Sequence, residues 1–342
     1  MNLRQLAALL GLSPTTVSRA LNGYPEVNED TRKRIVAAAR KHGYAPDPKA
    51  RQLATGKTMA IGHVLTISDR HEMTNPIFAD FLAGAGEVYS NHGYDIRITV
   101  VPDTEEAEAY RKFASQGYVD GVVVHGPLPH DPRIALLNEI GIPFVVHGRT
   151  GTDDDKFSWV DVNNRKSFMT GAEHLIALGH HRIGLVNGIE SHDFALRRHL
   201  GMVQALEHHG LTLDPDHVVT GEMTETSGYQ GALRMLEGPN PPSAIMTASI
   251  LSAIGVRRAA EERGMVLGQD LSLVTFDDDL SYLRNEGRTP LFTSLKSSVR
   301  DAGKLCAEML LGLIAAPGGA RQTRLLEAEL VLGQSTGPIP KA

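Results

Sequence analysis

Hydrophobic and polar positions in the first twenty-two residues alternate with the period of a helix. Apolar residues three and four apart stand on both sides of Gly11-Leu12-Ser13, a pattern that predicts two short amphipathic helices joined by a tight turn. The predicted apolar stripe consists of Leu3, Leu6, Ala7, Leu10, Val17, Ala20 and Leu21. Ser13 is placed to cap the second helix, and Pro14 suits its first turn. The pattern is typical of a helix-turn-helix.

Two further helical segments are predicted before residue 58. The first runs from about 29 to 42, with Asn28 or Asp30 as its cap and Gly43 at its end. The second is short and occupies 48–54, with Asp47 as its cap. Isolated helices of fewer than about 12 residues are marginal in water. We therefore expect this short helix to need support from outside itself.

From Met59 onward the pattern changes to strands and helices in alternation. Two successive series appear, one before and one after Trp159, and such alternation predicts parallel sheets covered by helices on both faces. Strands are expected at 59–66, 94–101, 120–125, 142–147, 182–187, near 218, 244–247 and 271–276. The expected fold is an all-α headpiece followed by a two-lobed α/β core of doubly wound sheets. Ligands of such sheets bind beyond the carboxyl ends of the strands, so a small molecule is expected between the lobes.

The outward positions of the second helix carry short or hydrogen-bonding side chains, namely Thr15, Thr16, Ser18, Arg19 and Asn22. A slim helix with such a face fits the major groove of DNA. The alternative is an ordinary helical hairpin with a polar, solvated face.

Charge divides the chain unevenly. Residues 1–58 hold ten Lys and Arg against four Asp and Glu, and the remainder holds 24 against 36, which together give the net charge of −6. A basic front favours phosphate contacts, although chance clustering is the alternative. The single cysteine, Cys306, excludes an internal disulfide and is expected to be a buried helical thiol in a reducing compartment. Without a signal-like start or an apolar run near 18 residues, the chain is expected to be cytoplasmic, with no membrane partner.

Five motifs in the first 54 residues together resemble the DNA-binding headpiece and hinge of the LacI/GalR repressor family. They are Leu3-Arg4-Gln5-Leu6-Ala7, Val17-Ser18-Arg19-Ala20-Leu21-Asn22, Thr31-Arg32, Gly43-Tyr44-Ala45-Pro46 and Ala50-Arg51-Gln52-Leu53-Ala54. The body is similar to the family's effector-binding core, notably at Asn75-Pro76-Ile77-Phe78, 117–124, 173–183, 274–278 and 291–295. The resemblance implies a headpiece at 1–46, a hinge helix and linker at 47–58, and a core at 59–342. Its lobes would be about 59–160 with 291–320, and about 161–290 with 321–342. The chain would cross between them near Asp161, Arg288 and Ser297, with a strand at 291–296 in the first lobe and a final strand at 323–331 in the second.

The resemblance implies a homodimer that binds a palindromic DNA operator, usually as a repressor. Arg4, Arg32, Lys49 and Arg51 would contact phosphates, while Thr15, Thr16 and Arg19 would read base edges. Ala50 lies in the hinge motif, and Leu53 matches the family's wedge leucine, which would enter the minor groove and bend the duplex. A small molecule bound between the lobes would melt the paired hinges and so control operator affinity.

Candidate effector contacts stand at the expected strand ends and at one family motif. They are Phe78, His125, Arg149, Phe194, Arg198, Ser249 and Asp277. Phe78 and Phe194 would be aromatic platforms for a sugar ring, with a place in the core as the alternative for Phe78. Arg198 stands three residues before Gly201, as the family's effector arginine does, and Asp277 would be its partner. Where the family usually has an Asn-Asp pair, this chain reads Ser249-Ile250. The amino-acid sequence resembles the branch of this family that regulates α-glucoside uptake. A maltose- or trehalose-like sugar is therefore expected as the effector, with a purine or a sugar phosphate as alternatives.

The sequence contains no motif that is typical of catalysis, metal binding or cofactor binding. No phosphate-binding loop, G-x-G-x-x-G, nucleophile elbow or zinc-ligand motif is present, so we expect no enzyme activity, no cofactor and no metal. Two rival hypotheses remain. A solute-binding protein for transport is opposed by the basic headpiece, and a headpiece-fused sugar-processing enzyme would need a catalytic pair that the chain does not show.

Overall fold

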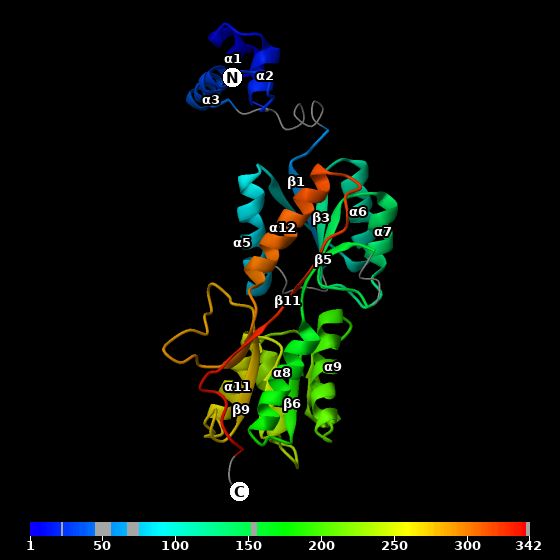
Figure 1. Ribbon diagram of the computed structural model, residues 1–342, viewed down its shortest axis with the longest axis vertical. Helices are drawn as coiled ribbons and strands as arrows, with labels where there is room; N and C mark the ends of the chain where they lie inside the picture. The colour runs from blue at the N-terminus through cyan, green and yellow to red at the C-terminus, as the bar shows by residue number, and fades with distance from the viewer. Residues whose placement is uncertain (22, 45–55, 67–74, 152–155, 340–342) are drawn as a thin grey trace.

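The computed structural model describes residues 1–21, 23–44, 56–66, 75–151 and 156–339 (Figure 1). The headpiece consists of three helices, α1 (Leu3–Leu10), α2 (Pro14–Leu21) and α3 (Glu29–Lys41). The predicted apolar stripes meet in a small core, in which Leu6, Val17 and Ile35 are fully buried. The helix-turn-helix prediction is confirmed.

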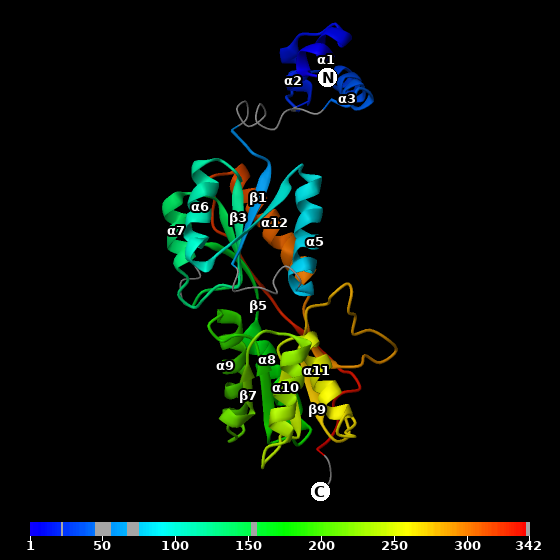
Figure 2. The ribbon, with the colours of Figure 1, turned by 180° about the vertical axis from the view of Figure 1, so that it is seen from behind.

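The first lobe of the core is built on a six-stranded sheet with the order β11-β5-β4-β3-β1-β2. Helices α5 and α12 pack on one face of this sheet, and α6 and α7 pack on the other (Figures 1 and 2). The elements are β1 (Ala60–Thr66), α5 (Pro76–Asn91), β2 (Asp95–Val101), α6 (Glu106–Ser115), β3 (Gly121–His125), α7 (Pro132–Ile140), β4 (Phe144–His147), β5 (Ser158–Val162), α12 (Val299–Ala315) and β11 (Thr323–Leu326). All its ladders are parallel, as predicted for this series.

The second lobe repeats this architecture with the order β12-β10-β9-β8-β6-β7. Helices α8 and α9 cover one face, and α10 and α11 cover the other (Figure 2). The elements are α8 (Asn164–Ala177), β6 (Ile183–Asn187), α9 (Asp193–His208), β7 (Val218–Thr220), α10 (Glu225–Leu236), β8 (Ala244–Thr247), α11 (Ile250–Glu261), β9 (Ser272–Asp277), β10 (Thr293–Lys296) and β12 (Glu329–Val331). Short 3₁₀ turns precede α6 and β7, at Asp103–Glu105 and Pro215–His217.

The expected placement of the last strands was wrong. The strand expected at 291–296 was assigned to the first lobe, but β10 pairs in parallel with β9 of the second, where Leu295 joins the apolar core. The strand expected at 323–331 is in fact two strands, because β11 pairs with β5 of the first lobe and β12 runs antiparallel to β10. The chain therefore crosses between the lobes near 162, near 297 and near 327, and not near Arg288.

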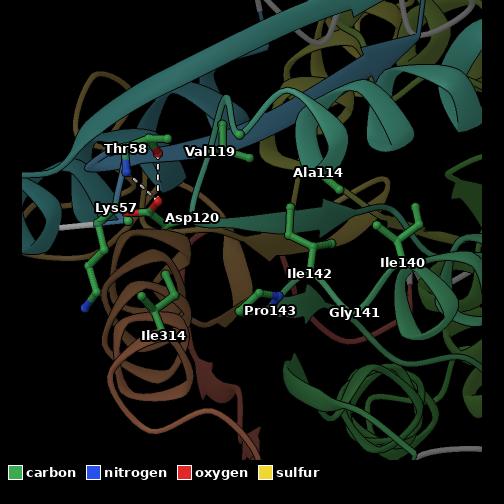
Figure 3. A pocket seen from close by; sticks show the side chains of 12 residues that line it. Lys57, Thr58, Ala114, Val119, Asp120, Ile140, Gly141, Ile142, Pro143 and Ile314 are labelled. Carbon is green, nitrogen blue, oxygen red and sulfur yellow. Dashed lines mark hydrogen bonds between the residues drawn. The ribbon is translucent and has the colours of Figure 1, made fainter. Parts of the chain in front are cut away.

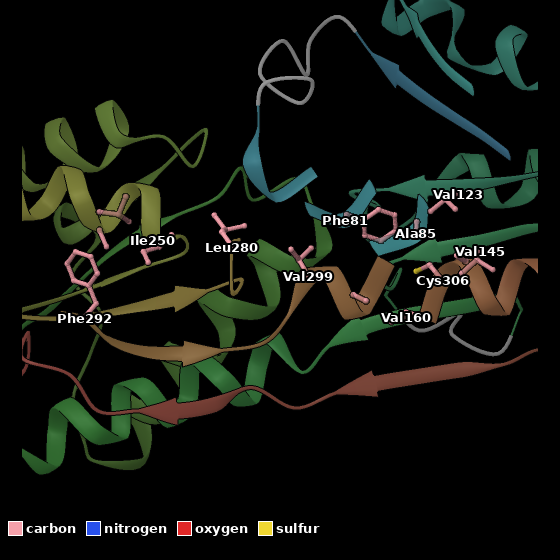
Figure 4. Packing of buried hydrophobic residues seen from close by; sticks show 14 of the residues in the cluster. Phe81, Ala85, Val123, Val145, Val160, Ile250, Leu280, Phe292, Val299 and Cys306 are labelled. Carbon is pink, nitrogen blue, oxygen red and sulfur yellow. The ribbon is translucent and has the colours of Figure 1, made fainter. Parts of the chain in front are cut away.

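One apolar cluster is continuous through both lobes. It includes Phe81 and Cys306 in the first lobe and Ile250 in the second. Leu280 and Val299 stand between these two groups (Figure 4). The thiol of Cys306 is fully buried on α12, as the sequence predicted, and burial raises its pKa. The two lobes therefore share packing near the crossover that precedes α12.

Helices α5 and α12 pack so closely that glycine is required at their crossing. A Cβ atom at Gly303 would lie 2.3 Å from the backbone oxygen of Phe81, and one at Gly84 would lie 2.0 Å from that of Arg300. We expect Gly303→Ala to lower the free energy of unfolding by about 1–3 kcal/mol, because the backbones must separate. Chemical denaturation measures the change. The matched control is Gly312→Ala on the same helix, where a Cβ meets nothing within 4 Å and alanine should raise stability by about 1 kcal/mol.

Candidate nucleic-acid interface and small-molecule site

Local hydrogen bonds fix both helices of the predicted DNA reader. The Asn2 and Gln5 side chains cap α1 reciprocally, and α1 ends at Gly11, whose φ of 65° lies in the left-handed region. The Ser13 hydroxyl oxygen accepts a bond from the Thr16 N–H at 3.0 Å, which confirms Ser13 as the cap of α2. Asn28, rather than Asp30, caps α3. The orientation of α2 is therefore set within the headpiece.

The polar face of α2 is partly free for a ligand. Thr15 and Arg19 are exposed, whereas Thr16 and Ser18 are half-buried. The Thr16 hydroxyl shares a hydrogen bond of 2.8 Å with Ser13. Arg4 on α1 is also exposed. Thr15 and Arg19 are accordingly the best placed of these candidates to reach base edges, and their role as readers stays a prediction.

Arg32 has partners inside the headpiece. Its Nη2 donates to the backbone oxygen of Tyr24 at 2.7 Å, and its Nη1 forms an ion pair with Glu29 at 3.2 Å. These bonds fasten the loop between α2 and α3. The predicted phosphate contact of Arg32 stays a prediction and would use a side chain that also serves the fold.

Five predicted DNA contacts lie outside the described residues. They are Asn22, Lys49, Ala50, Arg51 and Leu53. The linker becomes described at Gly56, and its entry into the first lobe is tightly held. Asp120 accepts hydrogen bonds from the Thr58 N–H at 2.7 Å, the Thr58 hydroxyl at 2.8 Å and the Met59 N–H at 2.9 Å. The carboxylate at the start of β3 therefore fixes the direction in which the linker leaves the lobe.

A pocket of about 390 Å³ lies beside this linker entry (Figure 3). Apolar residues such as Ile142 and Ile314 line it, together with Lys57, Thr58 and Asp120. It is at the amino-terminal edge of the first-lobe sheet, and none of the expected effector contacts lines it. The small-molecule site is therefore expected at the opposite edge of the sheet, at the carboxyl ends of the first-lobe strands.

Three histidines gather in the first-lobe sheet, two of them at the carboxyl ends of their strands and His63 halfway along its strand. The rings of His63 on β1, His125 on β3 and His147 on β4 pack together. The ring centroids of His63 and His125 are 5.2 Å apart, and those of His125 and His147 are 5.9 Å apart. Nδ1 of His63 and Nε2 of His125 are 2.9 Å apart. The expected contact His125 is half-buried, whereas Phe78, expected as an aromatic platform, is only 4% exposed. Phe78 packs edge-on against His125, with ring centroids 5.1 Å apart, and so supports that ring.

Burial of this cluster makes the fold sensitive to acid. Desolvation lowers the pKa of His63 and of His147 to about 4, and that of His125 well below 6.5. The unfolded chain therefore binds more protons below pH 6.5, and stability that is complete above that pH is lost as the pH falls toward 4. Each of His63 and His147 should contribute a loss of about 2 kcal/mol between pH 7 and pH 5.

We expect His147→Leu to remove about 2 kcal/mol of this pH-dependent loss of stability, because leucine has no titratable group. Denaturant unfolding at pH 7 and at pH 5 measures the difference. His208→Leu at an exposed position of α9 is the control and should keep the parent's loss. An unchanged loss in His147→Leu would show that this ring titrates normally.

The centre of the second-lobe site is Arg198 on α9. Its side chain is 6% exposed and lies with its guanidinium carbon 4.0 Å from the Phe276 ring centroid. Its Nε donates to Asn164 Oδ1 at 2.8 Å, and its Nη1 donates to the Ala248 backbone oxygen at 2.6 Å. Among the described residues no hydrogen bond is made by Nη2. The guanidinium is thus rigidly held, with one terminal nitrogen left over.

The acidic partner of Arg198 was predicted one residue too early. Asp277 instead accepts a hydrogen bond from the Asp279 N–H at 2.9 Å and faces Lys296. The carboxylates whose charges act on Arg198 are Asp278 and, to a smaller extent, Asp161. Burial raises the pKa of Asp278 to about 7 and lowers that of Arg198 to about 10, while the charge of each works against the shift of the other. In this arrangement β9 ends at Asp277, and the charge effect on the guanidinium comes from the following residue, Asp278.

A second buried pair stands at the crossover from the first lobe. Nε of Arg149 donates to Asp161 Oδ2 at 2.8 Å, and Asn164 Nδ2 donates to Asp161 Oδ1 at 3.2 Å. Burial raises the pKa of Asp161, against the effect of the Arg149 hydrogen bond. Because Asn164 also accepts from Arg198, one network joins strand ends of both lobes. Sequence reasoning missed Asn164 and Asp278. No strand was predicted before Asn164, whereas Asp278 stands two residues after the strand expected at 271–276.

The remaining predicted contacts differ in how open they are. Ser249 is fully buried, and its hydroxyl oxygen caps α11 by accepting from the Leu251 N–H at 3.2 Å. Phe194 is half-buried and stacks on His192, with ring centroids 6.0 Å apart. It also lies 5.1 Å from the guanidinium carbon of Arg198. Phe194 is therefore the better aromatic platform candidate, and Ser249 has a structural task.

The lobes also touch through direct hydrogen bonds. On one side, the Asp193 N–H at the start of α9 donates to the Pro127 oxygen at 2.9 Å, and the Gly151 N–H donates to Asp193 Oδ1 at 3.1 Å. Elsewhere on the junction, Asp80 of α5 accepts from the Ser281 N–H and hydroxyl, both at 2.7 Å. Burial works to raise the pKa of Asp80, but the Ser281 bonds outweigh it and lower that pKa overall. The relative position of the lobes is thus fixed by polar contacts on two elements.

Two absences apply to the described part of the chain. No group of three or more His, Cys, Asp and Glu side chains is arranged there to hold a metal ion. Every helix in those ranges is too short or too polar to cross a bilayer.

Comparison with known proteins gives matches over the whole length. Residues 2–47 match the model for bacterial regulatory proteins of the lacI family, and residues 172–336 match a periplasmic binding protein-like domain. The HTH-type transcriptional regulator AglR of Rhizobium meliloti is 42% identical over 99% of this chain and 95% of its own length. The HTH-type transcriptional regulator RafR of Escherichia coli is 36% identical over 81% of this chain and 82% of its own length. A solved complex of the transcriptional regulator CelR with cellobiose superposes with a TM-score of 0.72 at 26% identity, covering 98% of this chain and 99% of that one. The chain therefore belongs to the LacI family of helix-turn-helix transcriptional regulators.

Proposed function

We propose that this regulator binds a palindromic operator as a homodimer and that an uncharged sugar, of the α-glucoside class, controls its affinity from the junction of the two lobes. The observation that carries the effector assignment is the buried network around Arg198. It offers fixed donors and acceptors from both lobes, beside the aromatic ring of Phe194. Hydroxyl-rich ligands need such paired polar groups, and the apolar face of a sugar ring packs on an aromatic side chain.

Charge balance in the network favours a neutral ligand. Arg149 is paired with Asp161, and Arg198 lies under the influence of Asp278. Two cations stand against two carboxyl groups, so the network keeps little net positive charge to hold a phosphate, even with the pKa of Asp278 raised to about 7. A sugar phosphate was an alternative because of Arg149, and its ion pair with Asp161 counts against that ligand. The relative CelR, solved with cellobiose, supports a neutral sugar by analogy.

The DNA-binding half of the proposal rests on the exposed face of α2. Thr15 and Arg19 would read bases, while Arg4 would position the headpiece on phosphates. Lys49, Ala50, Arg51 and Leu53 would complete the contact from the hinge, with Leu53 as the minor-groove wedge. Asp120 would then transmit the position of the first lobe to the linker through Thr58 and Met59. Operator binding places the protein with chromosomal DNA, so we propose the cytoplasm as its location.

A thermal-shift screen of the full chain tests the effector class. The panel contains maltose, trehalose, sucrose, glucose 6-phosphate and hypoxanthine. A ligand that binds only the folded state raises the melting temperature, and the rise grows with the ratio of ligand concentration to Kd. We expect an α-glucoside to give the largest shift and to change operator affinity in a gel-shift titration. A shift produced only by the phosphate or the purine would overturn the sugar assignment. Turnover of a bound sugar would instead favour an enzyme, and binding without any effect on DNA would favour a transport role.

A further inference from the structure

His63 is a buried polar residue that neither the DNA contacts nor the expected effector contacts explain. It lies halfway along β1, the strand next to the edge strand β2 of the first-lobe sheet, and is fully buried. Its Nδ1 stands 2.9 Å from Nε2 of His125, and the two rings are stacked with an interplanar angle of 21°. Its other nitrogen, Nε2, is buried and has no hydrogen-bond partner among the residues that the structure describes. Phe78 and His63 are 6.3 Å apart by ring centroids, too far for that ring to serve as an acceptor.

The orphan nitrogen decides which way the hydrogen bond between the two histidines points. A neutral imidazole carries one proton, so one of its nitrogens donates and the other accepts. With the proton on Nε2, His63 would bury an N–H donor without an acceptor. With the proton on Nδ1, the unpaired atom is only a lone pair. Orphaned buried N–H groups are the rarer and costlier case, so the Nδ1–H form of His63 is favoured.

The same choice fixes the tautomer of His125. If His63 donates through Nδ1, then Nε2 of His125 must accept and its proton must sit on Nδ1. Nδ1 of His125 makes no hydrogen bond with the described residues, and the ring is half-buried at the strand ends. The edges of Phe78 and Phe81 hold this ring, at centroid distances of 5.1 Å and 4.8 Å. The ring is thus packed in the orientation that the hydrogen bond requires.

We propose that His63 is a positioning residue that locks His125 as an Nδ1–H donor, so that the effector must present an oxygen acceptor, such as a hydroxyl or ring oxygen, at that point. This inference rests on the proposed function only in placing the effector at His125. The tautomer itself is a property of the protein without ligand. His63 therefore selects the polarity of the ligand atom without touching the ligand.

Nitrogen-15 NMR of the ligand-free full chain, labelled on histidine, reads the tautomer directly. His125→Gln identifies the resonances of His125 by their loss. We expect the parent to show His125 protonated on Nδ1 and His63 protonated on Nδ1 at pH 7.5. His125 protonated on Nε2 would overturn the inference and leave the proposed sugar binding standing.

Two substitutions of His63 separate the tautomer lock from simple packing. In His63→Asn the amide nitrogen takes the place of Nδ1 and keeps the donor, whereas His63→Leu removes it. We expect the leucine variant to show mixed tautomers of His125 and about tenfold weaker binding of the sugar found in the screen. The asparagine variant should keep the Nδ1–H form and bind within about threefold of the parent. Equal weakening in both, with an unchanged His125 tautomer, would show a purely structural role.

Discussion

Replacement of Arg198 by methionine is expected to weaken sugar binding roughly ten- to 150-fold while operator binding persists. Methionine keeps an unbranched, polarisable chain against Phe276, so the packing loss is small. What is lost is a guanidinium that holds Asn164 and Ala248 and has Nη2 left for a ligand. Hydrogen bonds to charged groups contribute about 1.5–3 kcal/mol each, which corresponds to roughly ten- to 150-fold in affinity.

Isothermal titration with the sugar identified by thermal shift measures the loss, and a gel shift measures the retained DNA binding. The matched control is Arg234→Met at an exposed position of α10 in the same lobe, which should bind sugar like the parent. Removal of Arg198 also leaves the nearby Asp278 without a compensating cation. The loss of stability relative to the parent should therefore be larger at pH 8 than at pH 6, because ionisation of the buried carboxyl becomes more costly. Full sugar affinity in Arg198→Met would place the effector elsewhere.

Local sequence signals predicted local structure well. Ser13 caps α2 because a hydroxyl one residue before a helix reaches its unpaired N–H groups, and the pattern that shows this lies within four residues. The strand expected at 291–296 was also found as β10. Its sheet was assigned wrongly, because the pairing of Leu295 with Phe276 is decided by contacts between distant residues. The break of the last strand into β11 and β12 likewise follows from two partners in different lobes.

The site was predicted in outline and missed in its details for the same reason. Arg198 was found from a motif and is buried at the junction. Asp277 and Asp278 follow the same strand, and periodicity cannot tell which of two adjacent carboxylates turns toward an arginine 79 residues away. Asn164 looks like an ordinary first residue of a helix until Asp161 and Arg198 are both in contact with it. Networks of this kind are defined by three elements at once, and no single stretch of sequence carries that information.

Arg19 and Arg4 are both exposed on the headpiece, yet their loss should affect DNA binding differently. Arg19 on α2 is placed to read a base, so Arg19→Ala should cost about 1–3 kcal/mol on a palindromic duplex selected from random DNA. The preference for that duplex over scrambled DNA should fall by the same factor. Arg4 precedes this helix and is expected to contact a phosphate. Arg4→Ala should weaken binding to all duplexes alike and reduce the slope of log affinity against log salt by about one.

Fluorescence anisotropy at several salt concentrations, with the selected and the scrambled duplex, separates these effects. Arg111→Ala on α6 of the first lobe removes the same exposed charge far along the chain from the headpiece and should change neither slope nor preference. If Arg19→Ala altered only the salt slope, α2 would be a phosphate-contacting helix and the reading face would have to be sought on another element. Because the two arginines differ in the helix that carries them and not in charge, the pair tests the assignment of α2 itself.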